Sequence, residues 1–205
     1  REHTHGETQL VTPQQARRLR ATHFSFSFVR NPFDRLVAAY NNKILEIDDV
    51  PLPMKSMGLH HGMAFNHFIE TVCEADPEHM DNHVRPQAEM LLYSNQIVPK
   101  FIGRMEHMSD HWQRLRRRMK KEGLPTLGEL PLKNVRRDGR SDIRNLFCST
   151  ELVNIVLERY AQDFNTFYSD YSIEELLNGD CLKKLPPLQR KTKESDLKKD
   201  LQPST

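Results

Sequence analysis

Residues 23–40 of the 205-residue chain read HFSFSFVRNPFDRLVAAY, and this stretch decides the fold. Its phenylalanines alternate with small polar residues, the period-two pattern of a half-buried strand, so we expect a strand over residues 23–29. From Asn31 to residue 47 the apolar residues recur at helical spacing. Asn31 suits the N-cap of that helix and Pro32 its first turn. The sequence therefore predicts a strand, a tight turn and a helix.

Arg30 stands at the junction between the expected strand and the expected helix. An arginine at the end of a buried strand offers a fixed cationic fork, and the next helix begins with free backbone N–H groups at the positive end of its dipole. In open α/β sheets, phosphate ligands bind at the carboxyl ends of strands. The pattern indicates a phosphate site at Arg30. The alternative, on these residues alone, is an ordinary surface or ion-pairing arginine at a helix start.

The rest of the chain continues to alternate between strand and helix patterns. Helices are expected where capping residues or a helical apolar stripe occur, over residues 12–19, 65–73, 109–119 (capped by Ser109), 151–164 and 172–178 (ended by Gly179). A second buried strand is expected over residues 97–105. Residues 48–62 and 123–140 are rich in residues that break periodicity and are interpreted as surface connections.

Composition limits the class of protein. Apolar residues make up 37% of the chain and charged residues 28%, which is typical of one soluble globular domain. No run approaches the ~18 apolar residues that span a bilayer, so we expect no membrane contact from this chain itself. The net charge of +2 is too small for a general polyanion-coating protein. Cys73, Cys148 and Cys181 form no C-x-x-C pair, which argues against a zinc site and leaves a single disulfide open.

Three stretches resemble a known family. Residues 28–40, FVRNPFDRLVAAY, resemble Phe-Val-Arg-Asp-Pro-Phe-x-Arg-Leu-x-Ser-Ala-Tyr, the 3′-phosphate-binding motif of the carbohydrate sulfotransferases of the chondroitin, dermatan and HNK-1 type and their bacterial relatives. Residues 82–87, NHVRPQ, resemble that family's Asn-x-His-Trp-x-Pro-Gln region. Residues 101–106, FIGRME, resemble its Phe-Ile-Gly-Lys-x-Glu strand. Order and spacing agree, and the resemblance covers roughly residues 12–167.

The resemblance implies an α/β fold, a P-loop-like three-layer sandwich with a central, mainly parallel sheet that is helix-rich in this portion. It also implies a transferase that moves a sulfuryl group from 3′-phosphoadenylyl sulfate (PAPS) to a carbohydrate hydroxyl. Carried over by position, Arg30 grips the 3′-phosphate of PAPS, with Asn31 and Arg35 as further cofactor-binding positions. The family serine that shares this phosphate falls at Ala38. Loss of its hydrogen bond costs about 1.5–3 kcal/mol, which weakens nucleotide binding without abolishing it.

The family's other donor-binding element, a strand, a basic loop with hydroxylated residues and a helix that hold the 5′-phosphosulfate, lies upstream. Residues 1–22 contain no match to it. Sulfuryl transfer needs cations and oriented N–H groups at the sulfuryl oxygens, so we expect this chain to be inactive by itself, as the C-terminal part of a longer enzyme or as a degenerate homologue. On this interpretation residues 1–170 belong to one sulfotransferase domain, and residues 171–205 form a short helix and a flexible basic tail.

His83 is the best candidate for the base that takes the acceptor proton, because imidazole titrates near neutral pH. The alternative is a structural histidine. Glu106 is either a base or, as we favour, a residue that orients an arginine. His60 and His61 are adjacent and point apart on an extended chain, so no metal is assigned.

A basic run over residues 114–121 raises the alternative of a polyanion-binding helix. Aromatic interleaving is missing, so we favour a solvated helix face and expect no nucleic-acid partner. A second interpretation of the whole chain is a non-catalytic nucleotide- or glycan-binding homologue. The resemblance leaves two compartments open: bacterial and cytoplasmic, or the Golgi lumen with a membrane anchor outside this chain.

Overall fold

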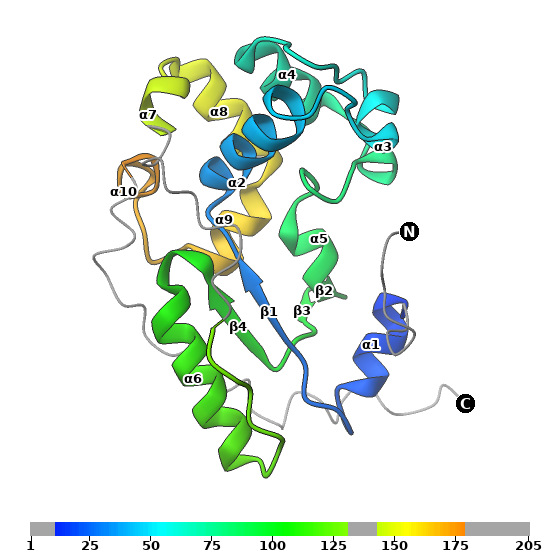
Figure 1. Cartoon of the computed structure of the whole chain (residues 1–205), viewed down its shortest axis with the longest axis vertical. Helices are drawn as coiled ribbons and strands as arrows, with labels where there is room; N and C mark the ends of the chain where they lie inside the picture. Colours follow the sequence, from blue (N-terminus) through cyan, green and yellow to red (C-terminus); the bar gives the residue numbers. More distant parts are fainter. Residues whose placement is uncertain (1–10, 131–142, 179–205) are drawn as a thin grey trace.

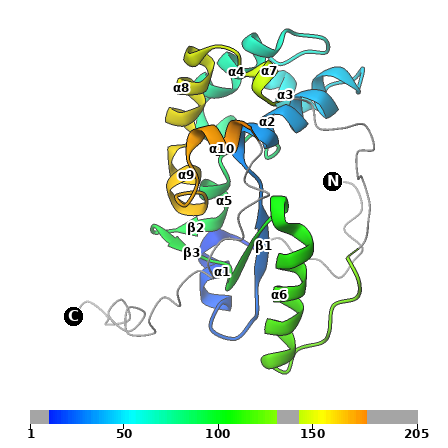
Figure 2. The ribbon, with the colours of Figure 1, turned by 90° about the vertical axis from the view of Figure 1, so that its left-hand side faces the viewer.

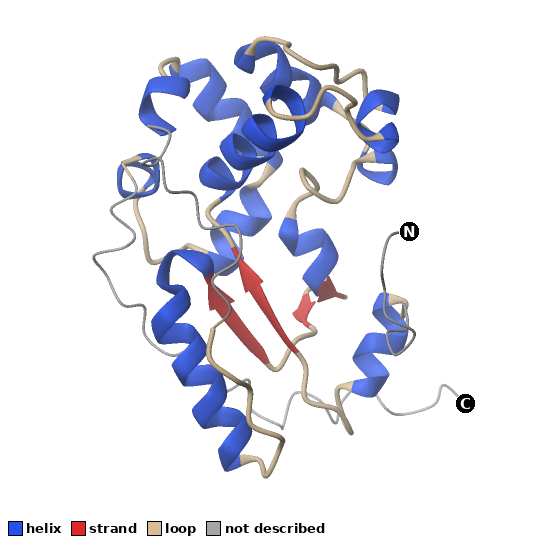
Figure 3. Cartoon of the chain, in the orientation of Figure 1, coloured by secondary structure: helices blue, strands red, loops and turns tan. Residues whose placement is uncertain are grey.

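The computed structural model describes residues 11–130 and 143–178, which form a mixed α/β fold rich in helix (Figures 1 and 3). Strand β1 (Phe26–Val29) pairs in parallel with strand β4 (Phe101–Arg104). The predicted strand before Arg30, the predicted α/β class and the parallel pairing are therefore confirmed. In the described ranges this parallel sheet has two strands, so the finer prediction of a three-layer, P-loop-like sandwich stays a prediction.

Most of the described chain is helical. The α-helices are α1 (Pro13–Leu19), α2 (Pro32–Ala39), α3 (Leu52–Ser56), α4 (Phe65–Glu74), α5 (Gln87–Leu91), α6 (Met108–Lys121), α7 (Ile143–Leu146), α8 (Thr150–Arg159), α9 (Ala161–Phe167) and α10 (Ile173–Leu177). A π-helix, η1 (Tyr40–Leu45), extends α2, and 3₁₀ turns occur at η2 (Pro77–His79) and η3 (Met105–His107). The expected helices after Thr12 and Ser172 are present, and each begins with a capping box, Thr12 with Gln15 and Ser172 with Glu175.

The two parallel strands lie between helix α6 on one side and helix α5 on the other (Figures 1 and 2). Helix α6 packs beside β4, and the ring of Trp112 lies 6.2 Å from the ring of Phe28, centroid to centroid. Helix α5 lies on the other side, next to β1. Helices α2, α4, α7 and α8 gather beyond the carboxyl ends of both strands (Figure 1). This arrangement places the β1–α2 junction at the centre of the molecule.

The core surrounds the start of α2. Val29 and Phe33, on either side of the junction, are fully buried. The Phe33 ring lies 5.0 Å from the Phe147 ring and 5.2 Å from the Phe164 ring, between centroids. Apolar burial of this kind contributes about 1.5–3 kcal/mol for each large side chain. The junction is therefore fixed by the core on one side and by polar contacts on the other.

Several predicted boundaries are wrong. The strand expected over residues 97–105 covers residues 101–104 only. Its first expected residue, Ile97, belongs instead to a hairpin of β2 (Leu92–Tyr93) and β3 (Gln96–Ile97). Ser94 and Asn95 form the turn of this hairpin, with positive φ angles of 49° and 58°. The expected loop over 48–62 contains α3.

Two helices also differ from their predicted limits. The single helix expected over 151–164 is broken at Tyr160, whose φ of −105° and ψ of 20° depart from helical values. Helix α6 begins at Met108 with His107 at the N-cap position, so Ser109 lies inside the helix rather than capping it. Gly179, Cys181, the basic tail and residues 131–140 of the expected connection lie outside the described residues.

Helix α10 packs into the same core as the rest of the described chain. Leu176 is 1% exposed and Tyr171 is 8% exposed. The predicted short helix after residue 171 is thus present, and its apolar side faces the preceding residues. The structure also has no helix, in the ranges it describes, that is long and apolar enough to span a membrane.

Gly103→Ala should destabilise the fold by about 1–3 kcal/mol, because a Cβ atom at residue 103 would overlap the ring of Phe28 on the paired strand. Urea denaturation of both proteins measures the difference. The same substitution should cost less in a Phe28→Leu background, where the ring is gone. Equal stability of Gly103→Ala and the unsubstituted chain would contradict this strand register.

Candidate functional site

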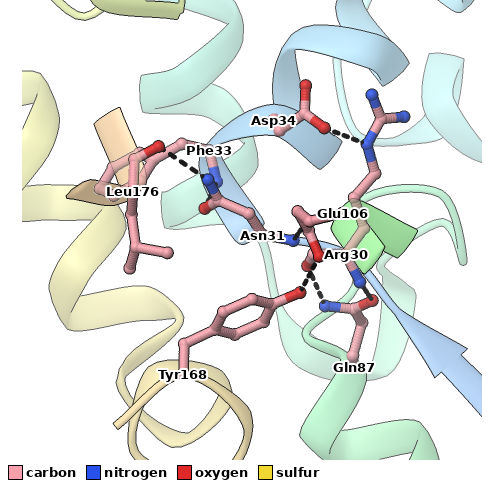
Figure 4. A network of polar contacts seen from close by, with 8 residues as sticks. All are labelled: Arg30, Asn31, Phe33, Asp34, Gln87, Glu106, Tyr168 and Leu176. Carbon is pink, nitrogen blue, oxygen red and sulfur yellow. Dashed lines mark hydrogen bonds and ion pairs between the residues drawn. The ribbon is translucent and has the colours of Figure 1, made fainter. Parts of the chain in front are cut away.

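Two side chains and one backbone carbonyl, from three other parts of the chain, hold the carboxyl end of β1 (Figure 4). The backbone N–H of Arg30 donates to Gln87 Oε1 at 2.8 Å, and Gln87 Nε2 donates to the Arg30 carbonyl at 2.8 Å. The next backbone N–H, that of Asn31, donates to Glu106 Oε1 at 2.5 Å. The Asn31 side chain donates to the carbonyl of Leu176 at 2.8 Å. These bonds fix the peptide groups on both sides of Arg30.

Asn31 caps helix α2, as predicted. Its Oδ1 accepts from the backbone N–H of Phe33 at 3.2 Å, and the residue is 1% exposed. Because the residue is buried, a ligand could contact the Asn31 side chain directly only if the surrounding groups moved. The predicted role of Asn31 in cofactor binding therefore stays a prediction, and the geometry supports an indirect, positioning form of it.

Glu106 places a carboxylate at the positive end of α2. Besides the Asn31 N–H, it accepts a hydrogen bond from the Tyr168 hydroxyl at 3.1 Å. Burial raises the pKa of Glu106, while the hydrogen bonds from Asn31 and Tyr168 act in the opposite direction. A helix N-terminus favours a negative charge of this kind. The favoured prediction of a structural role for Glu106 agrees with these contacts, although the group that it holds is a backbone amide rather than an arginine.

The expectation that free amides at the start of α2 help to bind a phosphate is wrong for the first amides of the turn. The N–H groups of Arg30, Asn31 and Phe33 all donate to side chains within the protein, and Pro32 has no N–H. The side chains of Gln87 and Glu106, from distant parts of the chain, and the N-cap Asn31 accept these hydrogen bonds, so these N–H groups already have partners within the protein.

The guanidinium of Arg30 is engaged on one side only. Its Nε donates to Asp34 Oδ2 at 2.5 Å, and both side chains are 30% exposed. Within the described residues, neither terminal nitrogen of Arg30 has a hydrogen bond or an ion pair, and Figure 4 shows them turned away from Asn31. A bond at Nε leaves the terminal fork available for a second acceptor. The geometry thus presents a cationic fork at the carboxyl end of β1.

Arg35 lies one turn further along α2 and contacts the turn that carries His83. It donates from Nη1 to the carbonyl of Arg85 at 2.5 Å and from Nη2 to the carbonyl of Asn82 at 2.6 Å. Burial lowers the pKa of Arg35. Both terminal nitrogens are therefore used inside the protein, and Arg35 ties the turn over residues 82–85 to the helix that follows Arg30.

His83 is paired with a buried carboxylate. Its Nδ1 lies 2.7 Å from Asp81 Oδ1, which also accepts the backbone N–H of His83 at 2.8 Å. The His83 side chain is 53% exposed, whereas that of Asp81 is 9% exposed. A carboxylate at Nδ1 orients an imidazole and leaves Nε2 free to accept a proton. This arrangement suits the predicted base, and the role of His83 stays a prediction.

Ala38 follows Asp34 by four positions on α2, so the two side chains share one face of the helix, and Asp34 is the residue that pairs with the Arg30 guanidinium. It is half-buried, and its methyl group offers no hydrogen bond. The position that the family gives to a serine therefore faces the same side as the Arg30 fork without contributing a donor.

Comparison with known proteins decides the family. The sequence model of the sulfotransferase family matches residues 1–170 of the 205 in this chain. The chain belongs to the sulfotransferase family. A search of the curated proteins found no significant match, and a search of the solved structures found none either.

A second polar cluster joins β4 of this sulfotransferase to the segment before α10. Arg104 donates from both terminal nitrogens to the Asp170 carboxylate, at 2.6 and 2.9 Å. The same guanidinium lies 5.0 Å from the ring centroids of Tyr168 and Tyr171. The Tyr171 hydroxyl lies 2.9 Å from His107 Nε2. Bidentate and cation–π contacts together hold the C-terminal segment on the same end of the sheet as Arg30.

His111 should make the sulfotransferase lose stability as the pH falls. It is 5% exposed and accepts the backbone N–H of Arg104 at its Nδ1, at 2.6 Å. Burial, followed by the charge of Arg114, lowers the pKa of His111 to about 4. An unfolded histidine has a pKa of about 6.5, so between these values the unfolded state holds a proton that the folded state does not. Stability should fall by up to about 1.4 kcal/mol for each pH unit in this window.

Urea unfolding of the wild type and of His111→Asn across this window measures the effect. Asparagine keeps an acceptor near the position of Nδ1 and does not titrate, so the variant should show the smaller slope. Identical slopes would show that His111 has the same pKa in the folded and unfolded states, which would contradict the lowered pKa.

The sequence analysis also considered a histidine pair, His60 and His61, and a basic helix over residues 114–121. No group of three His, Cys, Asp or Glu side chains in this part of the chain could hold a metal ion. The rings of His60 and His61 contact the backbone oxygens of His61 and Ile47, respectively. On the basic helix, Arg116 pairs with Glu129 and Arg118 with Glu122, as expected of a solvated face.

The sequence analysis assigned no role to three residues that surround Arg30. Asp34 follows Arg30 by four positions, a spacing that predicts a helical ion pair and was available as a signal. Gln87 lies in one of the stretches that resemble the family. Tyr168 had no local signal, because its contact with Glu106 joins residues 62 positions apart.

Proposed function

We propose that this sulfotransferase binds PAPS with its 3′-phosphate at Arg30 and transfers the sulfuryl group to a carbohydrate hydroxyl. The observation that carries the proposal is the Arg30 fork, which lies at the carboxyl end of parallel strand β1, next to the buried Val29, and whose terminal nitrogens make no hydrogen bond or ion pair among the described residues. The carbohydrate acceptor rests on the resemblance of residues 28–40, 82–87 and 101–106 to carbohydrate sulfotransferases.

In this proposal each residue of the site has a separate role. Arg30 binds the 3′-phosphate, Asn31 and Glu106 hold the start of α2, and Arg35 keeps the turn of His83 close to that helix. His83, oriented by Asp81, takes the proton of the acceptor hydroxyl as its oxygen bonds to sulfur and the bond from sulfur to the nucleotide phosphate breaks. We assign the domain to residues 1–177, because α10 packs into its core. The membership of the sulfotransferase family supports a P-loop-like fold for this domain.

Binding of 3′,5′-ADP and 5′-AMP to the chain tests this function. The two nucleotides differ only in the 3′-phosphate, and a charge-assisted contact with Arg30 should make 3′,5′-ADP bind roughly tenfold or more tightly. Isothermal titration calorimetry at fixed salt measures both dissociation constants. Equal affinities would remove the 3′-phosphate site from the account.

A second function, nucleotide binding without catalysis, is favoured by two departures from the family pattern. Residues 1–22 lack a match to the 5′-phosphosulfate element, and Ala38 replaces the family serine. Because we expect residues 1–205 to be inactive by themselves, the full-length protein, including any segment before residue 1, is incubated with PAPS and a polysaccharide acceptor to separate the two functions. Sulfated product supports the transferase, whereas selective 3′,5′-ADP binding without product supports the binding protein.

A further inference from the structure

The side chain of Gln87 takes the place of a neighbouring strand at the end of β1. Its carboxamide accepts from the Arg30 N–H and donates to the Arg30 carbonyl, both at 2.8 Å, and so satisfies both main-chain groups of one residue (Figure 4). Gln87 is 5% exposed, so water does not compete freely for these bonds.

Gln87 is itself held by a second buried side chain. Asp163 on α9 accepts from the backbone N–H of Gln87 at 2.8 Å and from its Nε2 at 3.3 Å. The other carboxylate oxygen accepts from the backbone N–H of Ala88 at 2.6 Å. Asp163 is fully buried, and burial raises its pKa against the effect of these bonds. The carboxamide of Gln87 is therefore fixed in rotation as well as in position.

The two ends of Arg30 are thus held by different residues. Asp34 contacts the guanidinium, at the exposed end of the side chain, while Gln87 contacts the main chain from which the side chain extends. A bidentate contact between arginine and phosphate depends on the direction of the fork, and displacements of about 1 Å at such contacts have large effects.

We infer that Gln87 is the positioning residue for the 3′-phosphate site, acting through the main chain of Arg30 and held in place by Asp163. This inference rests on the proposed function. It assigns to the Asn82–Gln87 stretch a task on the donor side of the site, in addition to the acceptor-side role of His83. Gln87 touches no ligand in this account; it sets the direction from which Arg30 reaches one.

The test compares the ratio of the 5′-AMP dissociation constant to the 3′,5′-ADP dissociation constant in the wild type, Gln87→Met and Arg30→Ala. Methionine fills a similar volume and cannot bond to the Arg30 main chain. We expect the ratio to fall from roughly tenfold or more in the wild type to about one in both variants, with 5′-AMP affinity unchanged. In the Gln87→Met/Arg30→Ala double variant, the ratio should fall no further, because both substitutions remove the same contact.

Val156→Ala is the matched control for lost stability. Val156 is fully buried on α8 and its side chain forms no hydrogen bond, so this variant should melt earlier and keep the wild-type ratio. If Gln87→Met does not fold, Gln87→Asn carries the test. It adds no charge beside Asp163 and keeps a carboxamide, but its side chain is one methylene shorter and cannot reach the Arg30 main chain in the same geometry. Its ratio should lie between those of the wild type and Arg30→Ala.

The outcomes separate this inference from the function on which it rests. A wild-type ratio of one overturns the 3′-phosphate site itself. A wild-type ratio of ten or more that persists in a folded Gln87 variant overturns only the positioning role. Loss of the ratio in the Gln87 variant, with the ratio kept in Val156→Ala, is the result that the inference predicts.

Discussion

A chain that ends after residue 170 should be largely unfolded, whereas a chain that ends after residue 178 should fold. The family match ends at residue 170, yet the next residues complete the core. Leu176 and Tyr171 are nearly fully buried, and each contributes about 1.5–3 kcal/mol by burial. The shorter chain also loses the Leu176 carbonyl that accepts from the Asn31 side chain. The loss of these two burial contributions and of the hydrogen bond together is comparable with the lower end of the stability of a typical domain, about 5–15 kcal/mol.

Circular dichroism and urea denaturation of the two truncated chains measure this effect. The longer chain should give a cooperative transition, and the shorter one should lack it or show it at much lower urea. Because both chains lack every residue after 178, the comparison isolates α10. Equal transitions would show that the family match already contains the complete folding unit.

Asp163→Ala should cost about 3–5 kcal/mol of stability, the largest loss expected from a single side chain. The substitution leaves two buried donors without an acceptor, the backbone N–H groups of Gln87 and Ala88. It also removes the second acceptor of Gln87 Nε2, which still donates to the Arg30 carbonyl. Each buried, unsatisfied group costs about 1–3 kcal/mol, and no solvent reaches Asp163 to replace the carboxylate. Denaturation at neutral pH measures the loss.

Asp170→Ala is the control for this prediction. Asp170 also binds through two hydrogen bonds, from Arg104, but its side chain is 32% exposed, so water can hydrate the guanidinium that is left behind. Its loss should therefore be clearly smaller than that of Asp163→Ala. Comparable losses would mean that burial does not set the cost of removing these carboxylates.

The local elements near Arg30 could be predicted from sequence because their signals are local. Alternating phenylalanines predicted β1, and Asn31 followed by Pro32 predicted the start of α2, since caps and periodicity act within a few residues. The same rule failed at Tyr160, where apolar spacing continues through a break between two helices. Periodicity reports which side of a segment is buried, and not whether its hydrogen-bond ladder is continuous.

The contacts that shape the site could not be predicted in this way. Gln87 and Arg30 are 57 positions apart, and Glu106 and Asn31 are 75 positions apart. Each of these side chains satisfies a backbone group whose position depends on the packing of the whole domain. The position of Arg30 between β1 and α2 could therefore be predicted, whereas the hydrogen bonds of the neighbouring amides could not. Amides that are free in an isolated helix are satisfied by distant side chains in the folded protein.

The most direct measurement is calorimetric titration of 3′,5′-ADP into the wild type, Arg30→Ala and the control Arg18→Ala, whose side chain is exposed on α1. The account predicts that Arg30→Ala weakens binding roughly tenfold or more and that Arg18→Ala leaves it unchanged, with both variants as stable as the wild type within about 1 kcal/mol. Equal affinity of Arg30→Ala and the wild type for 3′,5′-ADP would contradict the account.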